Sequence, residues 1–559
     1  MDISPETLTE MIEGLSLYLN RRECQLGELC GSIDPQHFEE YRHSHLDAII
    51  RDYQDTNEIN IPIYLRARYD IILAQITLLR DITQRDRNAS ELNKRSPLEK
   101  LEAAWPYNFF LSCTISNKLA KNESLSISLL ELLDKSLGTI EKSAQINFCV
   151  DLPWLLDHYK AAQAYGTPLL LIYGAEDIGI ETTKLHKFSF LTACYVKPEG
   201  IGLNHSKISL FAYDDGSMRV VISTANLIAI DWDDNTQGLW ISPKLPRLKN
   251  KENKNSGESP TGFRQDLIDY LSCYKVSELN YWINRLQNSD CSSVNVCLVY
   301  SIPGVRTAND TRYGHLRLGK LLSKHVENAK STDTIVAQSP SVGKFGPTPN
   351  DWAGGEFLTS ASACRQADGE KVHQDRNRPD KPDFRFVFAT EENVKNGYGG
   401  FEFACRFTMC KYEMYIEQKW IQNILCQWVS DKRHRSRCMP HIKTYCRVAG
   451  SALAEKPEGL RWFLLTSANM SKNAWGSMPY YRKNTFQIGS YEIGVLFLPK
   501  FVLGTDLLPL TDSKEGPAFP MPYDLPLVPY GDSDQMFFTD IERPLAQQFQ
   551  ENDRIENGH

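Results

Sequence analysis

The chain has 559 residues, enough for about two to four domains, and 42% of them are hydrophobic, which excludes a globally disordered protein. The formal net charge of −8 excludes the overall basic character of many nucleic-acid-binding proteins, so a polyanion would have to bind in a local groove. The sequence shows no signal peptide and no unbroken apolar run long enough to cross a membrane, and we expect a soluble intracellular protein.

The fourteen cysteines contain no C-x-x-C pair. The pairs Cys291/Cys297 and Cys405/Cys410 have no histidines at zinc-binding spacing. We therefore expect reduced thiols, no structural zinc and no other metal.

The first hundred residues favour helices. Ser4-Pro5 is typical of a helix start, and apolar residues at helical spacing predict a second helix over about Leu65–Ile82. The polar run Arg85–Lys100 is interpreted as a linker. The region could be a partner-binding appendix or a helical lid packed on the main body, and its periodicity favours the lid.

From Trp105 the pattern changes to alternating strands and helices. Leu169–Tyr173 predicts a short buried strand. The polar stretch Lys244–Thr261 could contact DNA or serve as a localisation signal, but a solvated insertion is the favoured interpretation. Apolar spacing from Phe263 to Leu271 then predicts a helix.

A second domain is expected to open with a strand over Val296–Tyr300, followed by a helix over Leu318–Val326. Lys344–Asp383 is rich in Gly, Pro and Asp and predicts a surface loop. A strand over Phe384–Phe388 and a long helix over about Tyr412–Val429 follow.

The first chemical motif is His205-Ser206-Lys207. Residues two apart on an extended segment point to the same face, so an imidazole would project beside a positive charge. The Asp-Gly turn within Asp214–Ser217 predicts a hairpin. Its second strand ends in S-T-A-N-L, which contains Asn226.

The motif recurs downstream as His441-Ile442-Lys443. A predicted strand, Trp462–Leu465, then leads to T-S-A-N-M, which contains Asn469. A third triplet, His158-Tyr159-Lys160, lacks this context and is predicted to lie on a helix surface. The shared context therefore indicates a diverged duplication in which each half supplies one His, one Lys and one Asn.

Two such sets facing each other could cleave a phosphodiester. One imidazole would attack phosphorus while the other protonates the leaving oxygen. The lysines and asparagines would stabilise the charge that develops on the non-bridging oxygens. This chemistry requires no metal.

The duplicated His-x-Lys followed by Asn resembles the phospholipase D superfamily. Most of its members carry an Asp five residues after the Lys, where this chain has Ala212 and Val448. In lacking both of these Asp residues, the chain resembles the tyrosyl-DNA phosphodiesterase family. Five further strings carry the same resemblance: D-W-D-D-N-T-Q-G-L-W from Asp231, M-P-H-I-K-T-Y from Met439, T-S-A-N-M-S-K-N-A-W-G from Thr466, S-Y-E-I-G-V-L-F-L-P from Ser490 and P-Y-D-L-P from Pro522. The resemblance spans roughly Trp105–Asp540.

The resemblance implies a role for each motif residue. His205 would be the nucleophile that forms a phosphohistidine, and His441 the proton donor and acceptor. Gln237 and Glu492 would orient the two imidazoles. Glu492 could instead form a surface salt bridge, but its apolar neighbours favour a place in the cleft. The phosphate would be held by Lys207, Lys443, Asn226 and Asn469.

Contacts with the rest of the substrate are implied for Phe148, Ser341, Ser471 and Asn473. Three positions depart from the family pattern. Ile201 stands where the family usually has a Phe that stacks on DNA, Phe148 replaces a Tyr, and Pro340-Ser341 replaces a Ser-Ser pair. For Phe148, contact with the substrate and simple core packing remain open alternatives.

The expected fold is α/β, with two similar phospholipase D-like domains, each a mixed sheet flanked by helices, related by a pseudo-twofold. We expect an N-terminal helical extension and linker over residues 1–104, and the two domains over residues 105–293 and 294–559. The implied function is a nuclear DNA repair enzyme, monomeric and without a cofactor. It would cleave the 3′-phosphotyrosyl bond between DNA and a topoisomerase I peptide, and other 3′ adducts, leaving a 3′-phosphate. A phospholipase D-type lipid hydrolase or transferase and an inactive scaffold binding DNA ends are the alternatives.

Overall fold

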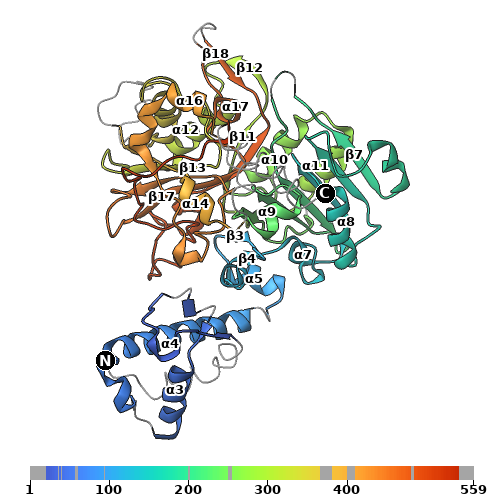
Figure 1. Ribbon diagram of the computed structural model, residues 1–559. Coiled ribbons are helices and arrows are strands. Elements are labelled where there is room, and N and C mark those ends of the chain that lie inside the picture. The colour runs from blue at the N-terminus through green and yellow to red at the C-terminus, as the bar shows by residue number, and fades with distance from the viewer. Residues whose placement is uncertain are drawn as a thin grey trace, which may run out of the picture. The chain divides into compact units, whose positions relative to one another are not determined.

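The computed structural model describes residues 21–34, 37–38, 41–56, 61–92, 95–198, 200, 202–249, 255–365, 381–398, 410–479 and 484–540 (Figure 1). The chain divides into two compact units. The first comprises Met1–Ser96 with Asn122–Ser124, and the second Pro97–Lys121 with Leu125–His559. The helix predicted from Ser4 lies outside the described residues. No helix among the described residues is long and apolar enough to span a membrane.

The N-terminal unit is small and has its own hydrophobic core. Its elements are β1 (Arg22–Glu23), β2 (Tyr41–Arg42), α3 (Ser44–Thr56), a 3-10 turn (Ile63–Arg68) and α4 (Tyr69–Leu92). The short strands β1 and β2 pair in parallel. Among the described residues of this unit, ten buried apolar side chains form the core: Phe38, Leu46, Ile49, Ile50, Ile61, Leu65, Ile72, Ile76, Leu79 and Ile82.

The helix predicted over Leu65–Ile82 is present but displaced along the chain, because the 3-10 turn precedes α4. The run Arg85–Lys100, predicted as a linker, contains the division between the two units at Ser96, but most of it is helical. Helix α4 continues to Leu92, and α5 (Pro97–Ala103) begins shortly afterwards. The polar residues of this run include good helix formers and no Gly, and its Pro stands at the first position of α5, where proline is tolerated. Polarity alone therefore did not distinguish a solvated helix from a linker.

The first half of the larger unit carries an eight-stranded mixed sheet of order β4-β3-β10-β9-β8-β5-β6-β7. The predicted strand Leu169–Tyr173 and the predicted hairpin are confirmed as β6 and the β8–β9 pair. The strands are β3 (Phe109–Ser112), β4 (Ser126–Ile127), β5 (Ile140–Asn147), β6 (Leu169–Tyr173), β7 (Leu191–Tyr195), β8 (Ile208–Tyr213), β9 (Met218–Ser223) and β10 (Gly238–Ile241).

The second half carries a seven-stranded mixed sheet of order β11-β19-β17-β16-β13-β14-β15. A separate two-stranded ribbon joins β12 (Gly304–Thr307) to β18 (Thr485–Ile488). The strands of the large sheet are β11 (Cys297–Ser301), β13 (Thr334–Gln338), β14 (Asp383–Val387), β15 (Leu425–Cys426), β16 (Thr444–Ala449), β17 (Gly459–Thr466) and β19 (Glu492–Phe497).

The two sheets repeat one topology, which is the structural form of the predicted duplication. In each, three parallel strands are followed across the sheet by antiparallel ones, and β10-β9-β8-β5-β6-β7 matches β19-β17-β16-β13-β14-β15. Register agrees as well. Ile208 pairs with Ile222, and Thr444 pairs with Leu465. The residues of the two His-x-Lys and Asn motifs therefore occupy equivalent positions.

Helices flank both sheets (Figure 1). Those of the first half are α5, α6 (Lys118–Lys121), α7 (Leu129–Leu132), α8 (Leu152–Ala161), α9 (Ala229–Asp233), α10 (Phe263–Ser272) and α11 (Asn280–Gln287). Those of the second are α12 (Gly314–His325), α13 (Leu358–Ala361), α14 (Glu391–Asn396), α16 (Tyr412–Ile416), α17 (Lys472–Trp475) and α18 (Pro499–Val502). The predicted helices at His158, Phe263 and Leu318 are confirmed as α8, α10 and α12.

The long helix predicted over Tyr412–Val429 is wrong. Helix α16 ends at Ile416, a 3-10 turn covers Lys419–Ile424, and β15 joins the sheet beside β14. The break lies at Gln418, whose buried side chain accepts a hydrogen bond from the amide of Phe345 at 2.7 Å and donates one to the carbonyl of Gly343 at 3.0 Å. These long-range bonds fix Gln418 outside the helical conformation, so tertiary contacts override the local periodicity.

Two predicted loops are only partly irregular. Within Lys344–Asp383, a π-helical turn (Trp352–Phe357) and α13 pack against the second sheet, and residues 366–380 lie outside the described part. Within Lys244–Thr261, the buried Leu245 forms a bridge with Met218, and residues 250–254 lie outside it.

The two sheets pack directly against each other. Phe109 of the first sheet lies 5.8 Å, ring centre to ring centre, from Phe463 of the second. At Gly238 an added Cβ would approach the side chain of Leu465 to 2.5 Å. One continuous core therefore joins the two halves of the larger unit. It fixes the ends of the strands that carry the two motifs.

Candidate active site

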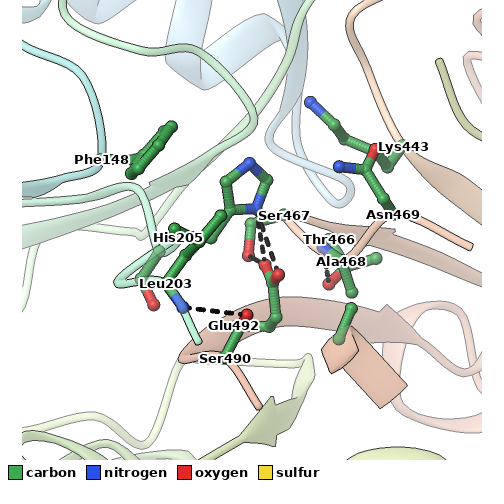
Figure 2. A network of polar contacts seen from close by, with 12 residues as sticks. Phe148, Leu203, His205, Lys443, Thr466, Ser467, Ala468, Asn469, Ser490 and Glu492 are labelled. Carbon is green, nitrogen blue, oxygen red and sulfur yellow. Dashed lines mark hydrogen bonds and ion pairs between the residues drawn. The ribbon is translucent and has the colours of Figure 1, made fainter. Parts of the chain in front are cut away.

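His205 is held by the opposite half of the unit. It lies just before β8, and its backbone amide donates to the carbonyl of Tyr491 at 3.1 Å. The carboxylate of Glu492, the first residue of β19, lies 3.0 Å from its Nδ1 (Figure 2). A carboxylate accepts from Nδ1–H, so Nε2 is left with its lone pair free to react.

His441 is held in the same crossed way by the first half. Its backbone amide donates to the carbonyl of Thr236 at 3.0 Å. Its Nδ1 lies 2.9 Å from Nε2 of Gln237 and 3.0 Å from Oδ1 of Asp231. Gln237 therefore contacts one of the two imidazoles that it and Glu492 were expected to orient, and Glu492 contacts the other.

Asp231 was missed by the sequence reasoning. It belongs to the short helix α9, is wholly buried, and accepts a second hydrogen bond from the backbone amide of Asn226 at 2.6 Å. It is the first residue of one of the strings that carried the family resemblance, but no spacing rule pointed from it to His441.

Residues that support the orienting groups are also duplicated. Thr224 Oγ1 donates to Oε1 of Gln237 at 2.7 Å, and Ser467 Oγ donates to Oε2 of Glu492 at 2.5 Å. Thr224 and Ser467 stand at the same place in the S-T-A-N and T-S-A-N segments. Each orienting side chain is thus fixed by a hydroxyl of its own half.

Lys207 and Lys443 are buried beside the imidazoles. Each ammonium donates to the carbonyl of its own motif histidine, at 2.7 Å between Lys207 Nζ and His205 O. Burial lowers the pKa of Lys207 to about 8. Burial, together with repulsion from Lys207, holds the pKa of Lys443 well below its usual value. Two cations that repel each other in a desolvated site are suited to an anionic ligand.

The asparagines end the same strand-loop segments. Asn226 Oδ1 accepts from the amide of Cys149 at 3.4 Å, and Asn469 Oδ1 accepts from Ser339 Oγ at 3.1 Å. Figure 2 shows Asn469 beside Lys443 and on the same side of His205. The structure therefore brings the predicted His, Lys and Asn set together.

The electrostatics of the site keep both imidazoles neutral when no ligand is bound. Burial lowers the pKa of His441 to about 4 against the opposing charge of Asp231. Burial lowers the pKa of His205 in the same way, against the charge of Glu492. Burial acts to raise the pKa of Glu492, but His205 and its other partners outweigh it and the carboxyl pKa lies below its usual value. An ionised carboxylate therefore stands behind a neutral imidazole.

Phe148 lies at the rim of this site and is half-buried. Its ring centre lies 5.6 Å from that of His205 and 5.7 Å from Nζ of Lys207 (Figure 2). This position favours contact with a bound substrate over simple core packing.

In the part of the chain that the structure describes, the other residues predicted to contact the substrate form no hydrogen bond with the two imidazoles or lysines. Ser471 caps α17 through its hydroxyl, and Ser341 is tied through its backbone to Ser339, which contacts Asn469. Asn473 is exposed on α17. Ile201 lies outside the described residues, and Pro340 is buried.

The positions of the missing aspartates belong to the core. Ala212 in β8 and Val448 in β16 are fully buried among apolar neighbours. An unpaired carboxylate there would be costly. These surroundings therefore favour the apolar residues that the chain carries at both positions.

The duplicated mixed sheets, with their paired His-x-Lys and Asn sets, have the arrangement expected of a phospholipase D-like phosphodiesterase. A model of the tyrosyl-DNA phosphodiesterase family matches residues 109–531, and the chain belongs to that family of hydrolases. It is 38% identical to tyrosyl-DNA phosphodiesterase 1 of Drosophila melanogaster, over 93% of this chain and 99% of that one. It is 32% identical to a probable tyrosyl-DNA phosphodiesterase of Caenorhabditis elegans, over 73% of this chain and 84% of that one.

Solved structures with a similar fold come from the same family. The crystal structure of the yeast tyrosyl-DNA phosphodiesterase matches 77% of this chain and 99% of that chain with a TM-score of 0.56, at 18% sequence identity. At that identity the match bears on the fold, and it supports the expected α/β architecture of two mixed sheets.

Proposed function

We propose that this protein hydrolyses the 3′-phosphotyrosyl bond between DNA and a topoisomerase I peptide through a covalent phosphohistidine. The observation that carries the proposal is the crossed support of the two imidazoles, His205 by Glu492 and His441 by Asp231 and Gln237. Each ring has its Nδ1 engaged by side chains of the opposite half, so Nε2 is the nitrogen that nucleophilic attack and proton transfer would use.

In the first step, Nε2 of His205 attacks phosphorus. The P–N bond forms as the bond from phosphorus to the tyrosyl oxygen breaks. His441, protonated in the presence of the anionic substrate, gives its Nε2 proton to the departing phenolate. Asp231 stabilises the imidazolium while that proton is held.

In the second step, the now neutral His441 takes a proton from water. The resulting hydroxide attacks phosphorus, the P–N bond breaks, and a 3′-phosphate end leaves. His205 returns to its neutral form with Glu492 on Nδ1. Lys207 and Lys443, with Asn226 and Asn469, stabilise the charge on the non-bridging oxygens in both steps. These cations make a catalytic metal or cofactor unnecessary.

The same site is expected to accept other 3′ adducts, because the groups described act on the phosphate, and His441 only protonates the leaving oxygen whatever group that oxygen carries. Phe148 would stack on the DNA end beside His205. Ser341, Ser471 and Asn473 are proposed to contact the substrate further from phosphorus. We further propose that the protein acts as a monomer in the nucleus, with residues 105–293 and 294–559 as the two catalytic domains.

One experiment separates this function from its rivals. Purified protein is incubated, with and without excess EDTA, with a 3′-phosphotyrosyl oligonucleotide and with phosphatidylcholine vesicles. We expect release of tyrosine and a 3′-phosphate oligonucleotide in both buffers, and no choline. Choline release alone would indicate a lipid hydrolase, and oligonucleotide binding without turnover would indicate an inactive scaffold. A strict need for added metal would contradict the mechanism.

A further inference from the structure

The N-terminal unit contains a cluster of two cysteines and two histidines that the catalytic chemistry does not use. Cys24, Cys30, His37 and His43 each offer one donor atom, and these four atoms all lie within 4.8 Å of one another. Both cysteines and His43 are buried, and His37 is half-buried. No zinc site was expected from the sequence, because the spacing of other cysteine pairs excluded one and these four residues stand far from C-x-x-C spacing.

Local structure explains how the four side chains meet. Gly27 adopts a φ of +48°, and its amide donates to the carbonyl of Cys24 at 2.9 Å, so the chain turns back and brings Cys30 beside Cys24. The parallel pair of β1 and β2, extended by the amide of Cys24 donating to the carbonyl of Arg42 at 2.9 Å, places His43 next to the turn.

Two of the distances between the donor atoms are close to those along the edges of a tetrahedral metal site. Nε2 of His37 lies 3.3 Å from Sγ of Cys30 and 3.2 Å from Nε2 of His43. Zinc bonds of about 2.3 Å to sulfur and about 2.0 Å to nitrogen place such atoms roughly 3.3 to 3.6 Å apart along the edges of a tetrahedron. Nε2 of His37 carries either one proton or one lone pair, so one well-directed hydrogen bond accounts for only one of these two contacts, whereas a metal ion accounts for both.

Aromatic rings cover the cluster. Phe38 stacks on His43 with ring centres 4.5 Å apart, and Tyr41 stacks on His37 at 5.1 Å. Both rings therefore limit the rotation of the imidazoles and shield the donors from water. Four protein donors with no position left for substrate are typical of a structural zinc site and not of a catalytic one.

We propose that Cys24, Cys30, His37 and His43 bind one Zn²⁺ ion, which holds the N-terminal unit together. Both thiols lose their protons on binding, so two protons are released for each ion, while the imidazoles bind in their neutral form. The metal links β1, the turn after it and the start of α3, next to a core in which the described residues supply ten buried apolar side chains. A core of that size gains much of its stability from such a cross-link.

The test measures metal directly on the full-length chain. Protein expressed in zinc-supplemented medium and freed of loosely bound ions by gel filtration should contain one zinc per chain by plasma mass spectrometry. Cobalt(II) added to the metal-stripped protein should give the d–d absorption of a tetrahedral site and a thiolate-to-cobalt charge-transfer band. Cys24→Ser and His43→Gln should lose the zinc and weaken both bands.

Two matched controls should keep the full zinc content. His45→Gln changes a buried histidine whose ring lies 5.9 Å from that of His43 without supplying a donor to the cluster. Cys194→Ser changes a half-buried thiol in the larger unit. Because the wild-type stoichiometry and the cobalt spectrum need no variant, a variant that fails to fold leaves the test intact.

Wild-type protein with clearly less than one zinc and no cobalt bands would overturn the proposal. So would full retention of zinc in Cys24→Ser or its loss in either control. Cleavage of a 3′-phosphotyrosyl oligonucleotide is not the readout, because the proposed catalytic groups lie in the other unit. The zinc site and the proposed function can therefore fail independently.

Discussion

Asp231 places its Oδ1 3.0 Å from Nδ1 of His441, and the equivalent position in the second half is Ala474. The two halves therefore differ at this position, and the difference is offset elsewhere in the site. Where the second half supplies a carboxylate at Glu492, the first half supplies the amide of Gln237, and the missing negative charge comes from Asp231 on α9. Both imidazoles thus keep one buried carboxylate, reached from different elements.

We predict that Asp231→Asn slows cleavage of a 3′-phosphotyrosyl oligonucleotide by about 10²-fold, the size of a lost general-acid contribution. Asp231 raises the pKa of His441 against the effect of burial. Without that charge the imidazolium becomes rarer at neutral pH, so the alkaline limb of the pH–rate profile, where the general acid loses its proton, should move to lower pH.

A good leaving group distinguishes this role from a structural one. A 3′-p-nitrophenyl phosphodiester needs no general acid, so Asp231→Asn should slow its first step much less, as seen in a single-turnover burst of nitrophenolate. Asp233→Asn, two residues along the same helix, is the matched control and should leave both substrates unaffected. Equal losses on both substrates would indicate a misfolded site instead.

The lysines predict how binding depends on pH. Burial lowers the pKa of Lys207 to about 8, so this side chain is mostly charged at pH 7 and mostly neutral at pH 9. The anionic phosphodiester binds the charged form. Above pH 8 binding must therefore take up a proton, and Kd should rise by up to about tenfold for each pH unit.

This trend can be measured by fluorescence anisotropy with the inactive His205→Ala variant and a labelled 3′-phosphotyrosyl oligonucleotide. The same oligonucleotide with a 3′-hydroxyl is the control and should show a much flatter profile. Lys207→Met should weaken binding at pH 7 and reduce the slope. A Kd that stays constant from pH 7 to pH 10 would show that the lysines are not the phosphate ligands.

The catalytic motifs were predictable because their signals are local and occur twice. His205, Lys207 and the hairpin after them follow from alternation and an Asp-Gly turn, and the second copy repeats them at His441. Asp231 was not predictable in this way, because it reaches His441 across 210 residues, through the pairing of Thr236 with Pro440. Contacts of that range depend on how the two sheets dock.

Two further features could not be predicted from the sequence for related reasons. The helix expected over Tyr412–Val429 breaks at Gln418, whose amide satisfies backbone groups of a distant segment. Cys24 and Cys30 were passed over because five residues separate them, and their histidines join them only through the turn at Gly27 and the pairing of β1 with β2. In each case a tertiary contact, absent from any local window, decides the structure.

Helix α5 predicts where the chain can be shortened. A protein that starts at Ser96 keeps α5, whose Leu101 packs with Phe110 and Leu129 in the core of the larger unit. It also keeps the 2.6 Å ion pair between Lys100 and Glu131. We expect this truncation to retain most of the catalytic activity.

Starting at Trp105 instead removes Leu101, and the loss of a buried leucine costs about 2 to 5 kcal/mol. Thermal unfolding should therefore show a clearly lower Tm for the shorter protein, with turnover measured below that temperature as the second readout. Soluble protein from Ser96 with an unchanged Tm and no turnover would place part of the N-terminal unit in the active site.

Replacing each of the two histidines should affect a different step of the reaction. The leaving tyrosine phenol has a pKa of about 10 and can depart partly unaided, whereas water needs a base to attack the phosphohistidine. His441→Ala should therefore slow the second step more than the first, so that protein covalently joined to DNA accumulates. His205→Ala should form no adduct.

A denaturing gel with a labelled oligonucleotide distinguishes the two variants, because protein joined to DNA migrates as a shifted band. If the link is a phosphohistidine, hydroxylamine or acid should cleave it and the band should disappear. His158→Ala, in the helical triplet on α8, is the matched control and should turn over like the wild type. An adduct in His205→Ala and none in His441→Ala would reverse the assignment. If neither variant traps an adduct while wild type still turns over, water attacks the phosphodiester directly, and Glu492 would then orient His205 as a base instead of a nucleophile.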